Sequence, residues 1–229
     1  MMIDFTTSAL LAIDVQNDFC PAYTAVSGEK RPAGALAVNQ GDEVIGPLNT
    51  LGERLVQAGG RLIATQDWHP QGHVSFASAH PGKHVGDTLD LPGVGGQVLW
   101  PDHGVQGSLG ASFHERLNLN PVSLIIRKGF RQNLDSYSAF FENDRKTPTG
   151  LDGFLRGLSM KTLIVGGLAT DYCVLYSVLD AVRLGYKTLV LIDGVRGVDY
   201  PEGSVERAFK AMEDAGIILA DSKEIEGNL

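Results

Sequence analysis

Reactive side chains follow four short apolar runs in this 229-residue chain. They are a carboxylate, a carboxylate with an imidazole, an ammonium and a thiol, supplied by Asp14, Asp67 with His69, Lys128 and Cys173. A thiolate is a strong nucleophile, a carboxylate can accept the thiol proton, and a neighbouring ammonium stabilises the thiolate. Each residue by itself has an ordinary explanation, such as a loop cap or a solvated charge. Together they predict nucleophilic catalysis.

Cys173 lies at the start of a predicted helix, after an apolar strand at 162–165 and the glycine pair 166–167. The glycines predict a tight turn, and Thr170 or Asp171 is expected to cap the helix. A thiol in the first helical turn meets the positive end of the helix dipole, which favours the thiolate. The alternative is a buried structural cysteine, which packs like a small hydrophobe. This segment alone does not decide between the two.

Asp67 and His69 are spaced for metal binding. Residues two apart on an extended chain point to the same side, and oxygen and nitrogen ligands suit zinc, iron or manganese. A third ligand can come from the other histidines, all of which lie within 67–120: His73, His80, His84, His103 and His114. His103 is favoured because Pro101, in the same loop, can hold its imidazole in place. The alternative is a turn with incidental polar residues.

Six predicted strands alternate with helical patterns and position these side chains. The strands are 9–14, 61–66, 123–127, 162–165, 188–192 and 217–220, and the helical patterns are 44–56, 174–182 and 205–212. Continuous apolar strands indicate a sheet covered on both faces, and the alternation indicates a doubly wound, mainly parallel α/β domain. Ligands bind beyond the carboxyl ends of such strands. The reactive residues should therefore share one edge of the sheet.

Composition narrows the class of protein. A hydrophobic content of 43% and a charged content of 20% are typical of a soluble globular chain. No apolar run is long enough to cross a bilayer, and the N-terminus does not resemble a signal peptide, so we expect a cytoplasmic protein. Two cysteines, Cys20 and Cys173, cannot form a disulfide framework. The net charge of −8 argues against a nucleic-acid surface.

The sequence shows no linker or internal repeat, so we expect one domain over residues 1–229. The long stretches 20–41 and 67–120 have weak periodicity, and loops of that length are often functional. The segments 29–42 and 141–150 match no motif and are candidates for tuning pocket access or subunit contacts. A homo-oligomer is compatible with the sequence.

Five segments, in this order, resemble the nicotinamidase/pyrazinamidase branch of the isochorismatase-like cysteine hydrolases. They are Asp-Val-Gln-Asn-Asp-Phe-Cys at 14–20, Asp-Trp-His-Pro at 67–70 with His-Val-Ser-Phe at 73–76, Trp-Pro-Asp-His at 100–103, Lys-Gly at 128–129, and Gly-Leu-Ala-Thr-Asp-Tyr-Cys at 167–173. The resemblance covers nearly the whole chain. It implies a single domain with a central six-stranded sheet and helices on both faces.

The resemblance also implies roles for individual residues. The catalytic triad would be Asp14, Lys128 and Cys173, and the backbone N–H groups of Ala169 and Cys173 would form the oxyanion hole. One divalent metal, zinc before iron or manganese, would be held by Asp67, His69 and His103. His73 is an additional ligand candidate, because family members differ at that position. Phe19, Trp100 and Tyr137 would line the substrate pocket, although ordinary core packing also explains Phe19 and Trp100. A cis peptide is expected at 168–169.

The activity implied is hydrolysis of nicotinamide to nicotinate and ammonia through a thioester, in NAD salvage, with pyrazinamide as a second substrate. The small-molecule carboxamide would be the main partner. One alternative is a related cysteine amidohydrolase for carbamoyl or ureido compounds, which have no ring nitrogen for a metal to bind. An isochorismatase proper is less favoured, since it has no need of a nucleophilic cysteine. A non-catalytic module that pairs Cys20 with Cys173 is the last alternative.

Overall fold

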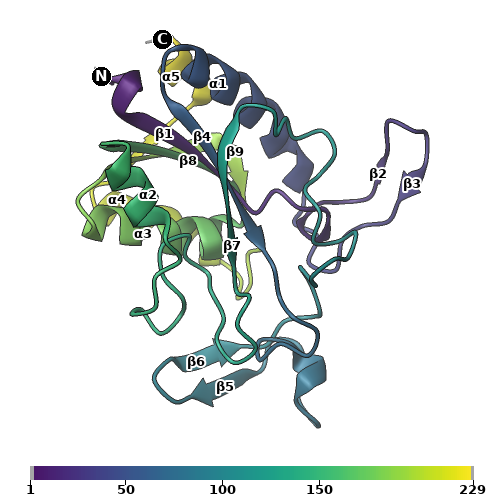
Figure 1. Ribbon diagram of the computed structural model, residues 1–229. Coiled ribbons are helices and arrows are strands. Elements are labelled where there is room, and N and C mark those ends of the chain that lie inside the picture. The colour runs from purple at the N-terminus through teal and green to yellow at the C-terminus, as the bar shows by residue number, and fades with distance from the viewer. Residues whose placement is uncertain (1–2, 228–229) are drawn as a thin grey trace.

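The computed structural model describes residues 3–227, which form an α/β fold around one six-stranded sheet (Figure 1). The strand order is β10-β9-β8-β1-β4-β7, and every neighbouring pair is parallel. The strands are β1 (Ser8–Ile13), β4 (Arg61–Asp67), β7 (Val122–Lys128), β8 (Thr162–Leu168), β9 (Lys187–Arg196) and β10 (Ile218–Ala220). All six predicted strands are present, and the predicted fold class is confirmed.

The winding direction of the chain reverses in the middle of the sheet. From β1 the chain moves outward through β4 to β7, then returns to β8 beside β1 and moves outward through β9 to β10. In open parallel sheets, ligands bind beyond the carboxyl ends of the strands at such a reversal. The reactive residues that end or follow β1, β4, β7 and β8 therefore lie where a doubly wound sheet places its ligand.

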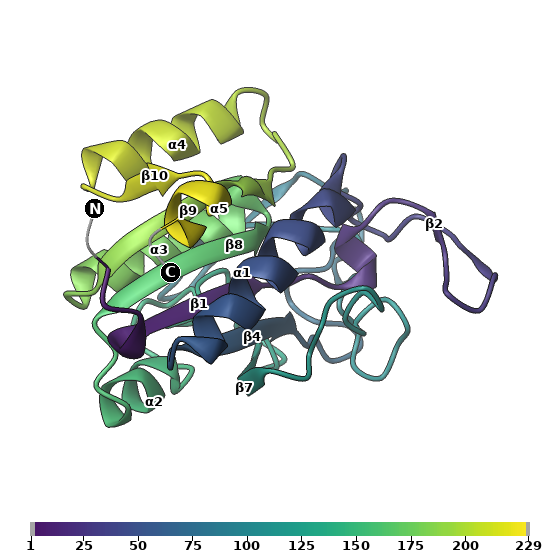
Figure 2. The same cartoon turned by 90° about the horizontal axis from the view of Figure 1, so that it is seen from above.

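Helices cover both faces of the sheet (Figure 2). Leu10 and Ala12 of β1 share a core cluster with α1 (Ile45–Gln57) and α5 (Ser222–Glu226). The alternate residues of the same strand, such as Leu11, belong to a second cluster with α2 (Leu151–Gly157), α3 (Leu175–Arg183) and α4 (Ser204–Asp214). This period-two alternation is the expected consequence of a strand buried on both faces. The sequence patterns predicted α1, α3 and α4 but neither α2 nor α5.

The glycine turn predicted after 162–165 is wrong. β8 continues through Gly166 and Gly167 to Leu168, and the chain bends at the cis peptide between Leu168 and Ala169. Gly167 has a φ of 120°, and a Cβ atom there would lie 2.1 Å from the carbonyl oxygen of Ile13. The glycine is needed because β8 passes very close to β1, not because the chain turns.

The predicted helix cap is also wrong. Residues Thr170–Val174 form a single π-helical turn that runs into α3, and Ala169 holds the N-cap position without a side-chain bond. The Asp171 carboxylate instead accepts hydrogen bonds from the Val198 and Asp199 N–H groups and the Ser204 hydroxyl, at 3.0, 2.9 and 2.5 Å. Asp171 therefore ties this turn to the loop before α4.

The two long stretches carry short elements. The first contains the hairpin of β2 (Tyr23–Thr24) and β3 (Lys30–Arg31), which projects from the body of the molecule (Figures 1 and 2). The second contains the hairpin of β5 (Thr88–Leu91) and β6 (Gly95–Val98), which lies beyond the carboxyl ends of the central strands (Figure 1). The short 3-10 turns are Phe5–Thr7, Asn17–Phe19, Gly41–Val44 and Ala77–Ala79. Within residues 3–227, no helix combines the length and apolarity needed to span a membrane.

Candidate active site

The Lys128 side chain lies at the centre of the site. β7 ends at this residue, and its ammonium group is completely buried. Nζ is 2.9 Å from Asp14 Oδ2 and 3.3 Å from Cys173 Sγ. It also donates hydrogen bonds to the Asp67 carboxylate and, at 2.9 Å, to the Ser136 carbonyl. One ammonium group therefore joins the predicted nucleophile to two carboxylates.

Asp14 follows β1 in a left-handed conformation, with a φ of 47°. The Thr65 hydroxyl fixes the residue twice, since it accepts from the Asp14 N–H at 3.1 Å and donates to Oδ1 at 2.6 Å. The second oxygen, Oδ2, pairs with the Lys128 ammonium but accepts no well-aligned hydrogen bond from the described residues. One carboxylate oxygen of Asp14 lies within 4.8 Å of Cys173 Sγ. Asp14 is thus placed to receive the thiol proton.

Burial controls the proton equilibria of this cluster. Burial raises the pKa of Asp14 to about 6, although Lys128 opposes that shift. Burial also raises the pKa of the Cys173 thiol well above its ordinary value; Lys128 opposes this, while the charges of Asp14 and Asp67 add to it. The net direction for the thiol is opposite to the one predicted from the helix dipole, because burial and two carboxylates outweigh it. Cys173 is a thiol at rest, and its proton must be removed.

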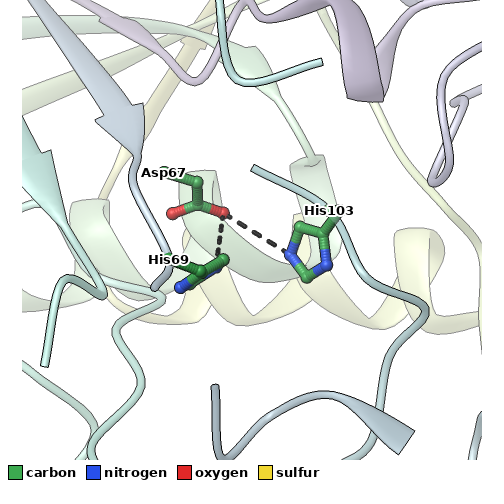
Figure 3. Close-up of side chains that lie close together, drawn as sticks. All are labelled: Asp67, His69 and His103. Carbon is green, nitrogen blue, oxygen red and sulfur yellow. Dashed lines mark ion pairs between the residues drawn. The ribbon is translucent and has the colours of Figure 1, made fainter. Parts of the chain in front are cut away.

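Asp67 links this cluster to two imidazoles (Figure 3). Its Oδ2 lies 3.6 Å from His69 Nε2 and 3.8 Å from His103 Nε2. The Nδ1 atom of His69 is 2.8 Å from the Gly129 carbonyl, and that of His103 is 2.7 Å from the Pro101 carbonyl. Because a carbonyl only accepts, each Nδ1 carries a proton, and in the neutral form of each ring the Nε2 lone pair is free to face Asp67. The three side chains can hold one cation between them.

The charges around Asp67 suit a cation site. Burial acts to raise the pKa of Asp67, but Lys128 and His69 outweigh it and lower the pKa. Burial and the charge of His69 lower the pKa of His103 to about 4, so this ring is neutral. For His69, burial lowers the pKa while the neighbouring Asp67 carboxylate raises it, and the net shift is upward when no cation lies between the two.

His73 lies beside these ligands, with one ring nitrogen within 4.8 Å of ligand atoms of His69 and Asp135. Its ring stacks on the His69 ring at a centroid distance of 4.3 Å. Nδ1 is 2.8 Å from the Ser75 hydroxyl, and Nε2 is 3.3 Å from the Leu134 carbonyl. Both ring nitrogens of His73 therefore already have protein partners. The cluster of three ligand atoms described above does not include this residue.

Two residues of the 14–20 segment position the site, and the sequence analysis assigned neither of them a role. The Gln16 amide accepts from the Asp67 N–H at 2.8 Å and donates to the Asp67 carbonyl at 2.9 Å. The Asp18 carboxylate accepts from the Gly104 N–H, next to His103, at 2.8 Å. Both residues belong to the 14–20 motif, and this was the feature of the sequence from which their role could have been predicted. The segment after β1 thus holds both Asp67 and the His103 loop.

A pocket opens onto Cys173 and the Asp67 cluster. The aromatic residues Phe19, Trp100 and Tyr137, predicted from the sequence, all line it, as does Ala169. Trp100 donates from Nε1 to the Tyr137 hydroxyl at 3.0 Å, and the Phe19 ring meets the His103 ring edge-on at 5.6 Å. The pocket also contains Leu36, Asp135, Tyr172 and Val198, which the sequence analysis missed. Leu36 brings the unassigned segment 29–42 to the pocket.

Cys20 and Cys173 do not pair. Both are free and buried, and they belong to core clusters on opposite faces of the sheet. Burial raises the pKa of Cys20 to about 12, so its thiol is unreactive. The alternative in which these two cysteines form a redox pair is therefore wrong for this conformation.

A thiol, a carboxylate and an ammonium at the carboxyl edge of a doubly wound sheet define an isochorismatase-like α/β hydrolase. The chain belongs to the isochorismatase domain family, which matches residues 8–224. It is similar to the nicotinamidases of Acinetobacter baylyi, at 43% identity over 95% of this chain and 94% of that one, and of Escherichia coli, at 44% over 96% and 98%.

Solved structures agree with these relatives. A structure described as an Acinetobacter baumanii nicotinamidase/pyrazinamidase superposes with a TM-score of 0.86 at 43% identity, covering 96% of this chain and 98% of that one. The Pyrococcus horikoshii pyrazinamidase, solved in complex with zinc, superposes with a TM-score of 0.73 at 31% identity, covering 94% and 99%. The resemblance inferred from the motifs is confirmed.

Proposed function

We propose that this chain is a metal-dependent nicotinamidase that hydrolyses nicotinamide to nicotinate and ammonia in NAD salvage, and that it also accepts pyrazinamide. The observation that carries the proposal is the position of Asp67, which bonds to Lys128 of the Cys173 cluster and faces His69 and His103. A site for amide cleavage and a site for a ring nitrogen thus share one pocket.

Asp14 and Cys173 carry the proton and the nucleophile in this mechanism. Asp14 takes the thiol proton, and Lys128 stabilises the thiolate as its sulfur attacks the amide carbonyl. The backbone N–H groups of Ala169 and Cys173 donate to the developing oxyanion. Asp14 then protonates the departing nitrogen, ammonia leaves, and a thioester on Cys173 remains. Water attacks the thioester, with Asp14 as base, and releases nicotinate and the thiol.

The residues around Asp67 fit a divalent metal, because two imidazole Nε2 atoms and one carboxylate oxygen face a common point. Asp67, His69 and His103 would hold the ion, which when bound supplies a Lewis-acid contact for the ring nitrogen. We propose zinc, with iron or manganese as alternatives. His73 remains an additional ligand only if its ring leaves Ser75 and Leu134.

The aromatic walls would hold the substrate ring. Phe19, Trp100 and Tyr137 are at least partly buried side chains that face the pocket, and aromatic faces favour stacking with a flat ring. We also propose that the chain works as a single cytoplasmic domain, which suits two free cysteines.

An ammonia-release assay with nicotinamide, pyrazinamide, benzamide and a ureido compound tests this function. We expect turnover of nicotinamide and pyrazinamide, and little of benzamide, which has the amide and ring but no ring nitrogen. The Cys173→Ala variant should lose at least about a thousandfold in activity while it keeps its fold and bound metal. Turnover of a ureido compound without turnover of nicotinamide would contradict the proposal, and so would appreciable amidase activity in the Cys173→Ala variant.

A further inference from the structure

A buried amide lies behind the pocket wall. Gln97 is on β6, and its side chain is 1% exposed. Its Nε2 lies 2.8 Å from Asp135 Oδ2, 3.2 Å from the Tyr137 hydroxyl and 2.9 Å from the Val98 carbonyl. Asp135 and Tyr137 line the pocket, whereas Gln97 is absent from the described lining residues. The Gln97 amide therefore contacts the wall residues from behind, on the side that faces away from the pocket.

Asn143 sets the orientation of this amide. Its Nδ2 donates to Gln97 Oε1 at 3.1 Å, so the NH2 group of Gln97 must face Asp135 and Tyr137. Asn143 Oδ1 accepts from the Tyr137 N–H at 2.9 Å, and the Asn143 N–H donates to the Asp135 carbonyl at 2.7 Å. Asn143 thus binds the backbone of Asp135 and Tyr137. It also binds Gln97, whose amide contacts the side chains of these two residues.

The network reaches the far wall of the pocket through one hydroxyl. Tyr137 Oη accepts from Gln97 and from Trp100 Nε1, so two N–H donors approach the same oxygen. Trp100 and Tyr137 each pack edge-on against the Tyr172 ring, at centroid distances of 4.8 and 5.4 Å. Fixing the Tyr137 hydroxyl therefore fixes the plane of Trp100.

We propose that Gln97 and Asn143 are positioning residues, an amide pair that holds Trp100, Tyr137 and Asp135 in the geometry that binds the substrate ring. This rests on the proposed function. It gives a role to the β5–β6 hairpin, which lies beyond the carboxyl ends of the sheet (Figure 1), and to the segment 141–150, which matched no motif. The amide pair acts on ring binding, since neither member contacts Cys173, Lys128 or Asp14 among the described interactions.

Isosteric amide-to-carboxylate exchanges test the pair. Gln97→Glu removes the donors to Asp135 and Tyr137, and Asn143→Asp makes the Gln97 amide reverse, so that Oε1 faces the Asp135 carboxylate. For each variant we expect the KM for nicotinamide to rise about tenfold while kcat changes by less than about threefold. The matched control is Asn49→Asp, which alters an amide that bridges Arg116 and Asn118 far from the pocket and should leave KM unchanged.

Tryptophan fluorescence reports the surroundings of Trp100 in the pocket wall and does not depend on turnover. The chain has two tryptophans, so a Trp68→Phe background leaves Trp100 as the only emitter. In the metal-loaded protein, both exchanges should shift the Trp100 emission maximum, because the Nε1 bond to Tyr137 loses its fixed acceptor. Asn143 is only half-buried, so its isosteric variant decides the matter if Gln97→Glu does not fold.

Folded variants with an unchanged KM, or with a changed KM and unchanged Trp100 emission, would overturn the proposal. If the wild-type protein released no ammonia from nicotinamide, the proposed function would fail, and the emission shift would still decide whether the amide pair positions Trp100.

Discussion

Lys128 is an ammonium group with no access to water, held by two carboxylates. Burial alone would lower its pKa, but the charges of Asp14 and Asp67 raise the pKa well above its ordinary value, so the group stays charged. Transferring such an ion from water is costly, and its partners must offset that cost. Lys128 therefore stabilises the fold by neutralising two buried carboxylates, in addition to its proposed role beside the Cys173 sulfur.

Replacing Lys128 should destabilise the fold as well as stop the reaction. Lys128→Met leaves two buried carboxylates facing each other, so we expect the free energy of unfolding to fall by about 3–5 kcal/mol. Urea unfolding monitored by circular dichroism measures the change. Lys210→Met, which removes an exposed ion pair with Asp214, should change stability by less than about 0.5 kcal/mol. Equal losses in the two variants would contradict this account.

The raised pKa of Asp14 predicts an acid limit on activity. A protonated carboxyl cannot take the thiol proton, so kcat/KM should fall about tenfold for each pH unit below about 6. The folded pKa lies above the ordinary value of 3.8, so the folded state binds the extra proton, and ionisation of Asp14 costs stability as pH rises from about 4 to 6. A kcat/KM profile from pH 4.5 to 8 checks the first effect; a flat profile would exclude Asp14 as the base.

At the scale of elements, the close approach of β8 to β1 places the Cys173 turn. Gly167 pairs with Ile13, and its missing side chain allows the two backbones to touch. The π-helical turn then presents Cys173 toward Lys128, while Asp171 anchors the turn to the loop before α4. The nucleophile is thus held on one side by the pairing of β8 with β1 and on the other by the Asp171 side chain.

Gly167→Ala should be severely destabilising. The new methyl group would meet the Ile13 backbone at a φ that L-residues rarely adopt, so we expect a loss of about 3 kcal/mol or more. The control is Gly153→Ala inside α2, where a Cβ meets nothing within 4 Å and should stabilise the protein by about 0.5–1 kcal/mol. Thermal unfolding of both variants measures the contrast. A stable Gly167→Ala protein would show that β8 can move away from β1.

At the scale of the whole molecule, the site joins the two halves of the sheet. Asp14 follows β1, and Asp67 and Lys128 are the last residues of β4 and β7, all on one side of the reversal, while Cys173 follows β8 on the other. Neither half holds a complete site. A metal bound at Asp67 would therefore stabilise the folded chain as a whole.

Removal of the metal should lower stability and activity together. A ligand present at about 100 times its Kd stabilises the folded state by about 2.7 kcal/mol, which for a chain of this size corresponds to roughly 5–10 °C in Tm. We expect chelation to lower the Tm of the wild type by that amount and zinc to restore it. His69→Ala, with one ligand removed, should show a much smaller shift. An unchanged wild-type Tm after complete metal removal would contradict the proposed site.

The sequence by itself determined the six strands, the fold class and the residues that meet at the carboxyl edge. Apolar runs depend on burial of each segment alone, and strand ends in a parallel sheet share one edge whatever the strand order. Asp14, Asp67, Lys128 and Cys173 could therefore be singled out without coordinates. The motif order added the aromatic residues of the pocket.

Only the tertiary structure decided how these residues behave. Cys173 is a protonated thiol because burial and the charges of Asp14 and Asp67, more than 100 residues away in sequence, act on it at once. His73 Nε2 has a partner, the Leu134 carbonyl, that local spacing does not indicate, and Gly167 is required by a neighbouring strand rather than by a turn. Proton affinity and close contact depend on the sum of surroundings from distant segments, which periodicity within one segment cannot report.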